Sequence, residues 1–327
     1  YSQSNIFINQ MQKIDVNKIT NSSNPIDQKA ELERFKNALI KDSFCLLVNH
    51  TISKELIDKA YDQSKLFHDM DDSDDRKQAA HYRFAESGRG WSPCGEEPAY
   101  SAGTKATCSA FDMCYEVKEL DKEYGNFGPN LWPPEMPDFQ ETIYDYFLAC
   151  SKLEKVIGSS MEEILDLEKG FITSRMTEKS PSTMRLIFYP EIKEDPEENL
   201  FGISAHTDYE IFTLLTQSEK GSELKNPDGE WTYVDSNRYE IILMIGDMTE
   251  VISNGLIKAT PHRVPPTKWE RYSITRFCAI DGHHIVEPLE QFIDPKVGPK
   301  YEPISQQKNI RDGLAEATAN SDAMNDI

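Results

Sequence analysis

The chain has 327 residues, of which 38% are hydrophobic and 28% are charged, a composition typical of globular proteins. No apolar run approaches the roughly 18 residues of a membrane-spanning helix, so we expect no membrane partner. The net charge of −21 would repel a phosphate backbone and argues against nucleic acid as a partner.

Helices are predicted to dominate the first half of the chain. Residues 27–40 carry apolar side chains on one face, as an amphipathic helix does. The apolar run 43–48 predicts a short buried strand, and Ser53 can cap a second helix after it. Residues 71–110 contain several glycines and are expected to be irregular, and a loop of this length is usually functional or disordered.

A long helix is predicted from Pro137 to about Leu167, because apolar residues recur there every three or four positions. After residue 183 the period becomes that of strands. The strand-like segments are MRLIFYP, ISAHTDYEIFTLLTQ, WTYVD, YEIILMIG, IKATPHRV and RYSITRFCAI. Many short strands with tight turns predict an antiparallel sandwich or barrel. The polar segment of about 25 residues at the end is expected to form a loose helix or a tail.

Several dipeptides in the second half are typical of turns. Asn254-Gly255 predicts a hairpin turn. Asp247 is expected to set a turn rather than to bind a metal. Pro265-Pro266 predicts a turn that would make the strands on its two sides neighbours in a hairpin.

Six cysteines are scattered through the chain without a CxxC pair. This pattern argues against a zinc ribbon and against a disulfide framework, and it favours a reducing compartment. We therefore expect a cytoplasmic location, with a leader removed ahead of Tyr1 left open.

The segment ISAHTDYEIFTLLTQ contains a pair of possible metal ligands. In a strand, residues two apart point to the same face, so His206 and Asp208 would project together. A third ligand should come from another strand, and His262 lies at the end of one. Two histidines and one carboxylate form the facial triad of non-haem Fe(II) oxygenases. With seven histidines in the chain, however, a chance HxD match and an ordinary buried histidine are competing interpretations.

A second pair strengthens the metal hypothesis. Arg271 and Ser273 are also two apart on a predicted strand, where a guanidinium and a hydroxyl can grip a carboxylate. The competing interpretation is a surface ion pair beside an outward serine. The turn at 265–266 would bring this pair close to His262.

These motifs together resemble the Fe(II)/2-oxoglutarate-dependent dioxygenases, in the branch of isopenicillin N synthase and plant-type hydroxylases. The resemblance covers roughly residues 28–285 in the family's order. The segments that carry it are DSFCLLVNHTI, GRGWSPCGEE, NLWPPEMPDF, MRLIFYP, HTD, GDMTEVISNGLIKATPHRV and RYS. Each motif alone is modestly specific, and their ordered set is strong.

The resemblance implies an α+β fold with a mainly β core: a double-stranded β-helix, or jelly roll, flanked by helices. It implies a single catalytic domain, 1–327. Within this domain we expect the N-terminal helix, strand and loop region 1–110, the helical region 111–182, the jelly-roll core 183–285 and the C-terminal extension 286–327.

The resemblance also assigns roles to residues. His206, Asp208 and His262 would hold Fe(II), and Arg271 with Ser273 would grip 2-oxoglutarate. Tyr189 matches a family tyrosine that hydrogen-bonds this cosubstrate. Asparagine often stands two residues before that tyrosine, but here the residue is Ile187, so one polar contact is expected to be missing.

The implied reaction balances four electrons. O2 accepts four, 2-oxoglutarate supplies two by decarboxylating to succinate, and a small specialised metabolite supplies two through hydroxylation, desaturation or cyclisation. One alternative is an oxidase of the isopenicillin N synthase type, which takes all four electrons from its substrate. Another is a non-catalytic jelly-roll binding module. We expect no obligate protein partner.

Substrate contacts are expected from the N-terminal loops and from residues flanking the HxD segment. Arginines among them would suit a carboxylate-bearing or amino-acid-derived substrate. The candidates are Tyr82, Arg83, Arg89, Trp91, Phe111, Arg185, Tyr209 and Phe277. For each arginine a surface charge, and for each aromatic residue a place in the core, is the competing interpretation. His68 and His81 are expected to be solvated.

Overall fold

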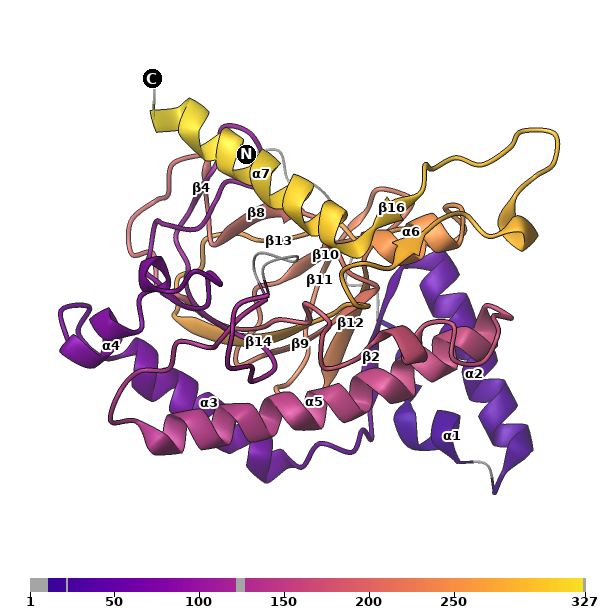
Figure 1. The fold of residues 1–327 in the computed structure, drawn as a ribbon, viewed down its shortest axis with the longest axis horizontal. Coiled ribbons are helices and arrows are strands. Elements are labelled where there is room, and N and C mark those ends of the chain that lie inside the picture. Colours follow the sequence, from indigo (N-terminus) through magenta and orange to yellow (C-terminus); the bar gives the residue numbers. More distant parts are fainter. Residues whose placement is uncertain (1–10, 22, 122–126, 326–327) are drawn as a thin grey trace.

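The computed structural model describes residues 11–21, 23–121 and 127–325. A β core lies between a layer that contains α3 and α5 on one side and α7 on the other (Figure 1). The helices are α1 (Val16–Thr20), α2 (Pro25–Lys41), α3 (Lys54–His68), α4 (Asp75–Ala79), α5 (Pro137–Ile164), α6 (Asp247–Ile252) and α7 (Gln306–Asn325), and the 3₁₀ turns are η1 (Tyr82–Phe84), η2 (Thr173–Arg175) and η3 (Glu290–Phe292). In this part of the chain no helix is both long enough and apolar enough to span a bilayer.

The larger sheet has eight strands and mixes parallel with antiparallel pairs. Its order is β1 (Lys13–Asp15), β2 (Phe44–Val48), β12 (Ile241–Ile245), β9 (Phe212–Gln217), β14 (Arg271–Cys278), β6 (Met184–Tyr189), β5 (Ser109–Met113) and β3 (Gly90–Ser92). A second sheet has four strands, in the order β11 (Trp231–Tyr233), β10 (Glu223–Lys225), β13 (His262–Val264) and β8 (Ile203–His206). Two small pairs complete the β structure: β15 (Ile285–Val286) with β16 (Ile304–Ser305), and β4 (Lys105–Ala106) with β7 (Leu200–Phe201).

The helical layer packs on the larger sheet through aromatic side chains. The ring of Phe67 on α3 lies 5.1 Å from that of Phe139 on α5 and 5.2 Å from that of Phe111 on β5, measured between centroids. All three are fully buried, and such pairs each add about 0.5–1.5 kcal/mol beyond the burial of their area. The predicted helices at 27–40 and 137–167 are therefore confirmed, and Ser53 caps α3 by accepting a hydrogen bond from the Leu56 amide.

The predicted single strand ISAHTDYEIFTLLTQ is wrong, because the segment forms two strands in different sheets. β8 ends at His206 and β9 begins at Phe212. Between them the chain crosses from one sheet to the other, and its carbonyl oxygens bind the start of α6. The amide of Asp247 donates to the Asp208 carbonyl (2.9 Å), and the amide of Met248 donates to that of Glu210 (3.1 Å). These bonds satisfy amides that a helix start leaves without partners.

Four expectations about local structure are also wrong, in whole or in part. β13 and β14 lie in different sheets, so the 265–266 segment is a crossover rather than a hairpin turn. Asn254 and Gly255 adopt φ of +49° and +80° after the end of α6, where they terminate a helix. Asp247 begins that helix. The region 71–110, expected to be irregular, contains α4, η1, the strands β3 and β4 and the start of β5.

The expectation that His68 and His81 are solvated is wrong, because both are buried. His68 lies at the end of α3, and its ring stacks on that of Phe188. Burial and the nearby Lys77 ammonium lower the pKa of His68 to about 3. The imidazole is therefore neutral in the folded protein.

The burial of His68 predicts a loss of stability in mild acid. The unfolded chain takes up a proton near pH 6.5, whereas folded His68 resists protonation until about pH 3, so stability falls as the pH drops through this window. Between pH 7.5 and 5.5 the contribution of this group is about 1 kcal/mol. Denaturant unfolding at the two pH values measures the change in the free energy of unfolding. This change should be smaller for His68→Phe than for the unaltered protein. The exposed His283→Gln is the control, and an unchanged difference in His68→Phe would contradict the prediction.

Candidate metal centre

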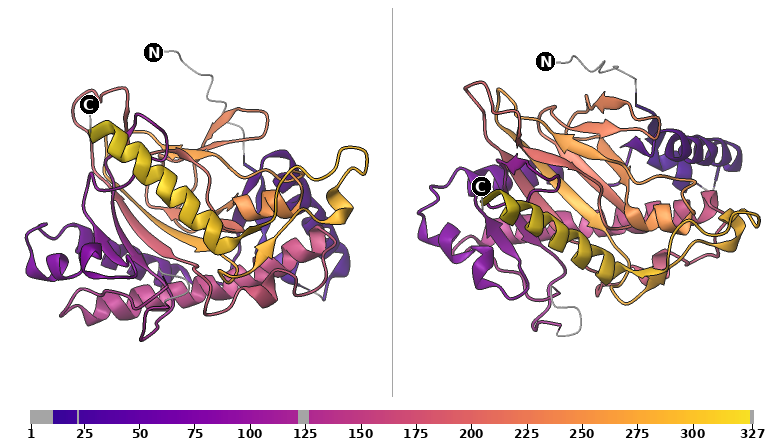
Figure 2. Two further views of the ribbon diagram at one scale, coloured as in Figure 1. Left: turned by 45° about the horizontal axis from the view of Figure 1, so that its top comes forward. Right: turned by 90° about the horizontal axis from the view of Figure 1, so that it is seen from above.

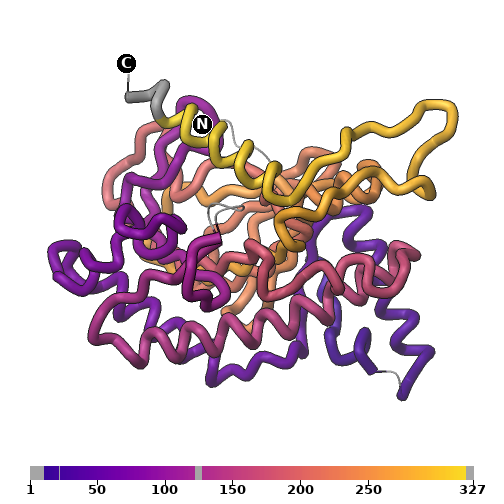
Figure 3. The backbone as a smooth tube through the Cα atoms, viewed as in Figure 1, coloured from indigo at the N-terminus to yellow at the C-terminus, as the bar shows by residue number. Residues whose placement is uncertain are grey.

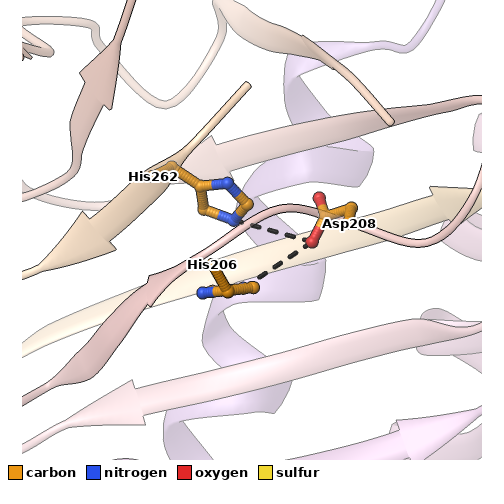
Figure 4. A group of neighbouring side chains, drawn as sticks. All are labelled: His206, Asp208 and His262. Carbon is orange, nitrogen blue, oxygen red and sulfur yellow. Dashed lines mark ion pairs between the residues drawn. The ribbon is translucent and has the colours of Figure 1, made fainter. Parts of the chain in front are cut away.

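Three side chains from two segments meet between the two sheets (Figure 4). His206 ends β8 and His262 begins β13, and these residues pair directly in the antiparallel ladder. Asp208 lies two residues beyond β8, in the crossover segment. Its Oδ1 lies 3.7 Å from Nε2 of His206 and 3.6 Å from Nε2 of His262. One possible ligand atom from each of the three residues lies within 4.8 Å of the others.

The histidine rings are oriented by the backbone of their own strands. Nδ1 of His206 donates a hydrogen bond to the carbonyl of Ser204 (2.8 Å), and Nδ1 of His262 donates to that of Thr260 (3.0 Å). A carbonyl oxygen can only accept, so these bonds place the proton of each neutral ring on Nδ1. Nε2 then carries the lone pair that a metal needs.

The charges of the site favour a cation. Burial, together with the neighbouring His262, lowers the pKa of His206 to about 3, so its ring is neutral at physiological pH. Asp208 is 4% exposed, and its second oxygen, Oδ2, accepts a hydrogen bond from the Thr213 hydroxyl. Oδ1 is thereby left facing both imidazoles. Two neutral nitrogens and one carboxylate oxygen on one side of a common point fit a divalent iron with open positions.

Arg271 and Ser273 lie on β14 in the other sheet. Both are fully buried. Nη2 of Arg271 donates to the Gln217 side chain (2.9 Å) and to the Ser222 hydroxyl (3.1 Å). The guanidinium carbon lies 4.5 Å from the centre of the Tyr189 ring.

Two polar atoms of this pair have no hydrogen-bond partner within the described part of the chain: Nη1 of Arg271 and Oγ of Ser273. A buried donor without a partner costs about 1–3 kcal/mol, which a bound carboxylate would recover. The residues present therefore fit one carboxylate group of a bound molecule.

One cavity connects the metal triad with the strands of the larger sheet. Of the six residues predicted for metal and cosubstrate, the triad and Tyr189 line it. Ile187 also lines it and is the cross-strand partner of Ser273, so an apolar side chain lies at the position that often carries asparagine. On the side of the C-terminal helix, Ile310 and Leu314 of α7 complete the wall.

The substrate candidates divide into two groups. Arg89, Arg185, Tyr209 and Phe277 line the cavity. Tyr82 and Arg83 do not; they lie exposed on η1. Trp91 and Phe111 belong to the hydrophobic core, as the competing interpretation of the aromatic candidates expects.

Arg185 is already engaged by acidic side chains. It forms a bidentate pair with Asp112 (both N–O distances 2.8 Å) and a further ion pair with Glu97 (2.5 Å). Two carboxylates offset its charge, so its availability to a substrate carboxylate is reduced.

Several residues near the site were not identified from the sequence. Gln217 and Thr213 follow the period-two pattern of β9 and could have been found from it. Ser222 and Tyr100 lie outside the recognised motifs, and only the fold brings them to the site. The hydrophobic residues of α7 gave no functional signal, because their segment is mostly polar.

The chain matches known proteins over most of its length. Residues 180–280 match the family model of the 2OG-Fe(II) oxygenase superfamily. Residues 12–135 match a second family model, described as the N-terminal region of the non-haem dioxygenase in morphine synthesis. The 2-oxoglutarate-Fe(II) type oxidoreductase hxnY of Emericella nidulans is 33% identical over 205 residues, which are 61% of this chain and 58% of that protein. Homoarginine-6-hydroxylase 2-ODD-C23.1 of Arabidopsis thaliana is 29% identical over 261 residues, 76% of each chain.

A solved structure shares the fold. A full-length Neurospora crassa protein in complex with alpha-KG superposes with a TM-score of 0.80 and 22% sequence identity, covering 93% of this chain and 96% of that one. Figure 2 shows the arrangement of the β core and its covering helices from two further sides, and Figure 3 traces the backbone through it.

Proposed function

Because the chain belongs to the 2OG-Fe(II) oxygenase superfamily, we propose that it is a dioxygenase that oxidises a small specialised metabolite and releases succinate and CO2. Fe(II) and 2-oxoglutarate are the cofactors of this family, and O2 is the oxidant. The observation that carries the proposal is the convergence of His206, Asp208 and His262 on one point of a cavity. We further propose that the two facing sheets form a double-stranded β-helix within a single catalytic domain.

Each residue near the metal has a defined task in this proposal. His206, Asp208 and His262 would hold Fe(II), which together with 2-oxoglutarate supplies the oxidation of the substrate. Ser204 and Thr260 orient the two rings through their carbonyls. Thr213 donates a hydrogen bond to Oδ2 of Asp208, so that Oδ1 would face the metal.

The cosubstrate would be bound by the opposite sheet. Arg271 offers a charged donor and Ser273 a hydroxyl, and both are buried where water competes little. Tyr189 lies against the guanidinium. The apolar Ile187 gives this pocket one hydrogen-bonding group fewer than a side-chain amide would.

The rest of the cavity supports a proposal for the substrate class. Tyr209, Phe277 and the α7 side chains offer apolar contact, while Arg89 brings a positive charge. A small molecule with a carboxylate, such as an amino-acid derivative, fits this combination. A relative named homoarginine-6-hydroxylase supports the same class.

The proposal is tested by a substrate screen. Purified protein with Fe(II), 2-oxoglutarate labelled at C1, and candidate amino-acid derivatives should release labelled CO2 and succinate only with a true substrate. Mass analysis then separates hydroxylation, which adds one oxygen, from desaturation or cyclisation, which removes two hydrogens. Product formation without CO2 release would instead support an oxidase of the isopenicillin N synthase type. Absence of both metal and 2-oxoglutarate binding would support a non-catalytic module.

A further inference from the structure

An aromatic ring from the loop before β4 lies against a metal-ligand histidine. The rings of Tyr100 and His206 stack with their centroids 4.5 Å apart and their planes inclined by 23°. The His262 ring lies 4.2 Å from the same imidazole. Rotation of His206 about its side chain would therefore require the Tyr100 ring to move.

Tyr100 is held in turn by a buried cluster of charges. Its hydroxyl donates a hydrogen bond to Oε1 of Glu97 (2.8 Å), and Glu97 is 7% exposed. The same carboxylate accepts from Arg185 (2.5 Å), which Asp112 fixes with two further bonds. A carboxylate that is paired and buried is a rigid acceptor, so the orientation of the phenol is set.

The backbone around Tyr100 is attached to the strand that ends in His206. The amide of Ser101 donates to the Ser204 hydroxyl (3.1 Å), and the Ser101 hydroxyl donates to the carbonyl of Ala205 (2.7 Å). The amide of Ala99 donates to the hydroxyl of Ser321 on α7 (2.7 Å). Hydrogen bonds thus attach loop 97–101 to β8 and to α7, and they define its position relative to His206.

We propose that Tyr100 is a positioning residue for the metal ligand His206, and that Glu97, anchored by Arg185, holds the Tyr100 ring in place. The inference rests on the proposed role of His206 in metal binding. It assigns to Arg185 a task within the protein in addition to its place on the cavity wall. Groups that orient a metal-ligating histidine typically change metal affinity about 10- to 100-fold when they are removed.

Anaerobic titration with Co(II), whose visible absorption reports the ligand geometry, tests the proposal. Tyr100→Leu removes the stacked ring and is expected to weaken Co(II) binding about 10- to 100-fold and to alter the absorption band. Tyr100→Phe keeps the ring and loses one hydrogen bond, so it should recover most of the affinity and remain about 2- to 10-fold weaker than the unaltered protein.

The link through Glu97 has its own test. Glu97→Leu removes the acceptor of the Tyr100 hydroxyl and also a partner of Arg185, so it is expected to weaken Co(II) binding at least as much as Tyr100→Phe. The double variant that carries Tyr100→Phe and Glu97→Leu should bind Co(II) no more weakly than Glu97→Leu alone, because the bond between Tyr100 and Glu97 is already lost in that single variant. Additive losses would overturn the role of Glu97.

Two matched controls separate positioning from general stability. Tyr301→Phe removes a tyrosine–glutamate hydrogen bond to Glu250 outside the cavity. Tyr144→Leu removes a ring stacked on Phe147, with centroids 5.6 Å apart. Both should bind Co(II) like the unaltered protein.

The outcomes are distinguishable. Unaltered Co(II) affinity and spectrum in folded Tyr100→Leu, with folding checked by thermal unfolding, would overturn the inference while leaving the proposed function intact. If Tyr100→Leu does not fold, the Co(II) affinities of Tyr100→Phe, Glu97→Leu and their double variant test the proposal instead. Failure of the unaltered protein to bind Co(II) would overturn both the inference and the proposed metal site.

Discussion

Replacing Asp208 with alanine is expected to abolish tight metal binding and, with it, turnover. Asp208 is the only anionic group of the triad, and one of its oxygens lies 3.6–3.7 Å from both histidine Nε2 atoms. Without it, two neutral nitrogens remain to hold a dication. The loss should exceed the about 10- to 100-fold caused by removing a group that merely orients a ligand. Anaerobic Fe(II) titration followed by calorimetry measures the effect.

Asp247 provides the matched control for this change. It lies at the start of α6, its side chain accepts a hydrogen bond from Asn309, and burial raises its pKa to about 6. It is not one of the three residues whose ligand atoms cluster. Asp247→Asn keeps the acceptor oxygen and is expected to retain Fe(II) affinity. If Asp208→Ala kept the Fe(II) affinity of the unaltered protein, Asp208 would not be a metal ligand. If only Asp247→Asn lost that affinity, the metal-binding carboxylate would be that of Asp247.

Changing Arg271 is expected to raise the KM for 2-oxoglutarate on the order of 100-fold or more, while Fe(II) still binds. A hydrogen bond to a charged group contributes about 1.5–3 kcal/mol, and Nη1 of Arg271 is the guanidinium nitrogen available to donate to a carboxylate. Arg271→Ala removes the charge, and Arg271→Lys keeps the charge but loses the planar guanidinium that directs Nη1 while Nη2 binds Gln217 and Ser222. Ser273→Ala removes one neutral donor and should raise the KM about 2- to 10-fold. Initial rates of succinate formation against 2-oxoglutarate concentration give these values.

Arg89→Lys serves as the comparison, because Arg89 lines the same cavity and donates to Thr183, which lies beside the end of β14 opposite to Arg271. It should change the KM for the substrate rather than the KM for 2-oxoglutarate. Unaltered kinetics in Arg271→Lys and Arg271→Ala would remove Arg271 from cosubstrate binding. Fe(II) titration of each variant separates a lost cosubstrate contact from a collapsed site.

The local periodicity of the sequence predicts the elements better than their connections. The apolar repeat of α5 and the short apolar run of β2 are local signals, and both elements form where they are expected. The division at Thr207–Ile211 is not local. It depends on the amides at the start of α6, which lie in a distant part of the chain and bind the carbonyls of Asp208 and Glu210.

The same distinction applies to the site. His206 and His262 become neighbours through strand pairing, as the sequence predicts, although Asp208 lies beyond the strand rather than on its face. The place of Tyr100 could not be predicted from the sequence, because its loop reaches His206 through hydrogen bonds of Ser101 to residues about 100 positions away. The burial of His68 likewise follows from the packing of α3 on the larger sheet. The acidic residues next to it in the sequence predict exposure instead.

The two sheets divide the work of binding between them. The histidines belong to the four-stranded sheet, whereas Arg271, Ser273 and Tyr189 belong to the eight-stranded one. If a keto acid is held at one end by iron and at the other by the Arg271 guanidinium, as proposed, it has to span the distance between the sheets, and the separation of the sheets would then select its chain length. On that proposal, we expect keto diacids one carbon shorter or longer to bind more weakly, because the backbone of the two sheets fixes the distance between the two binding groups.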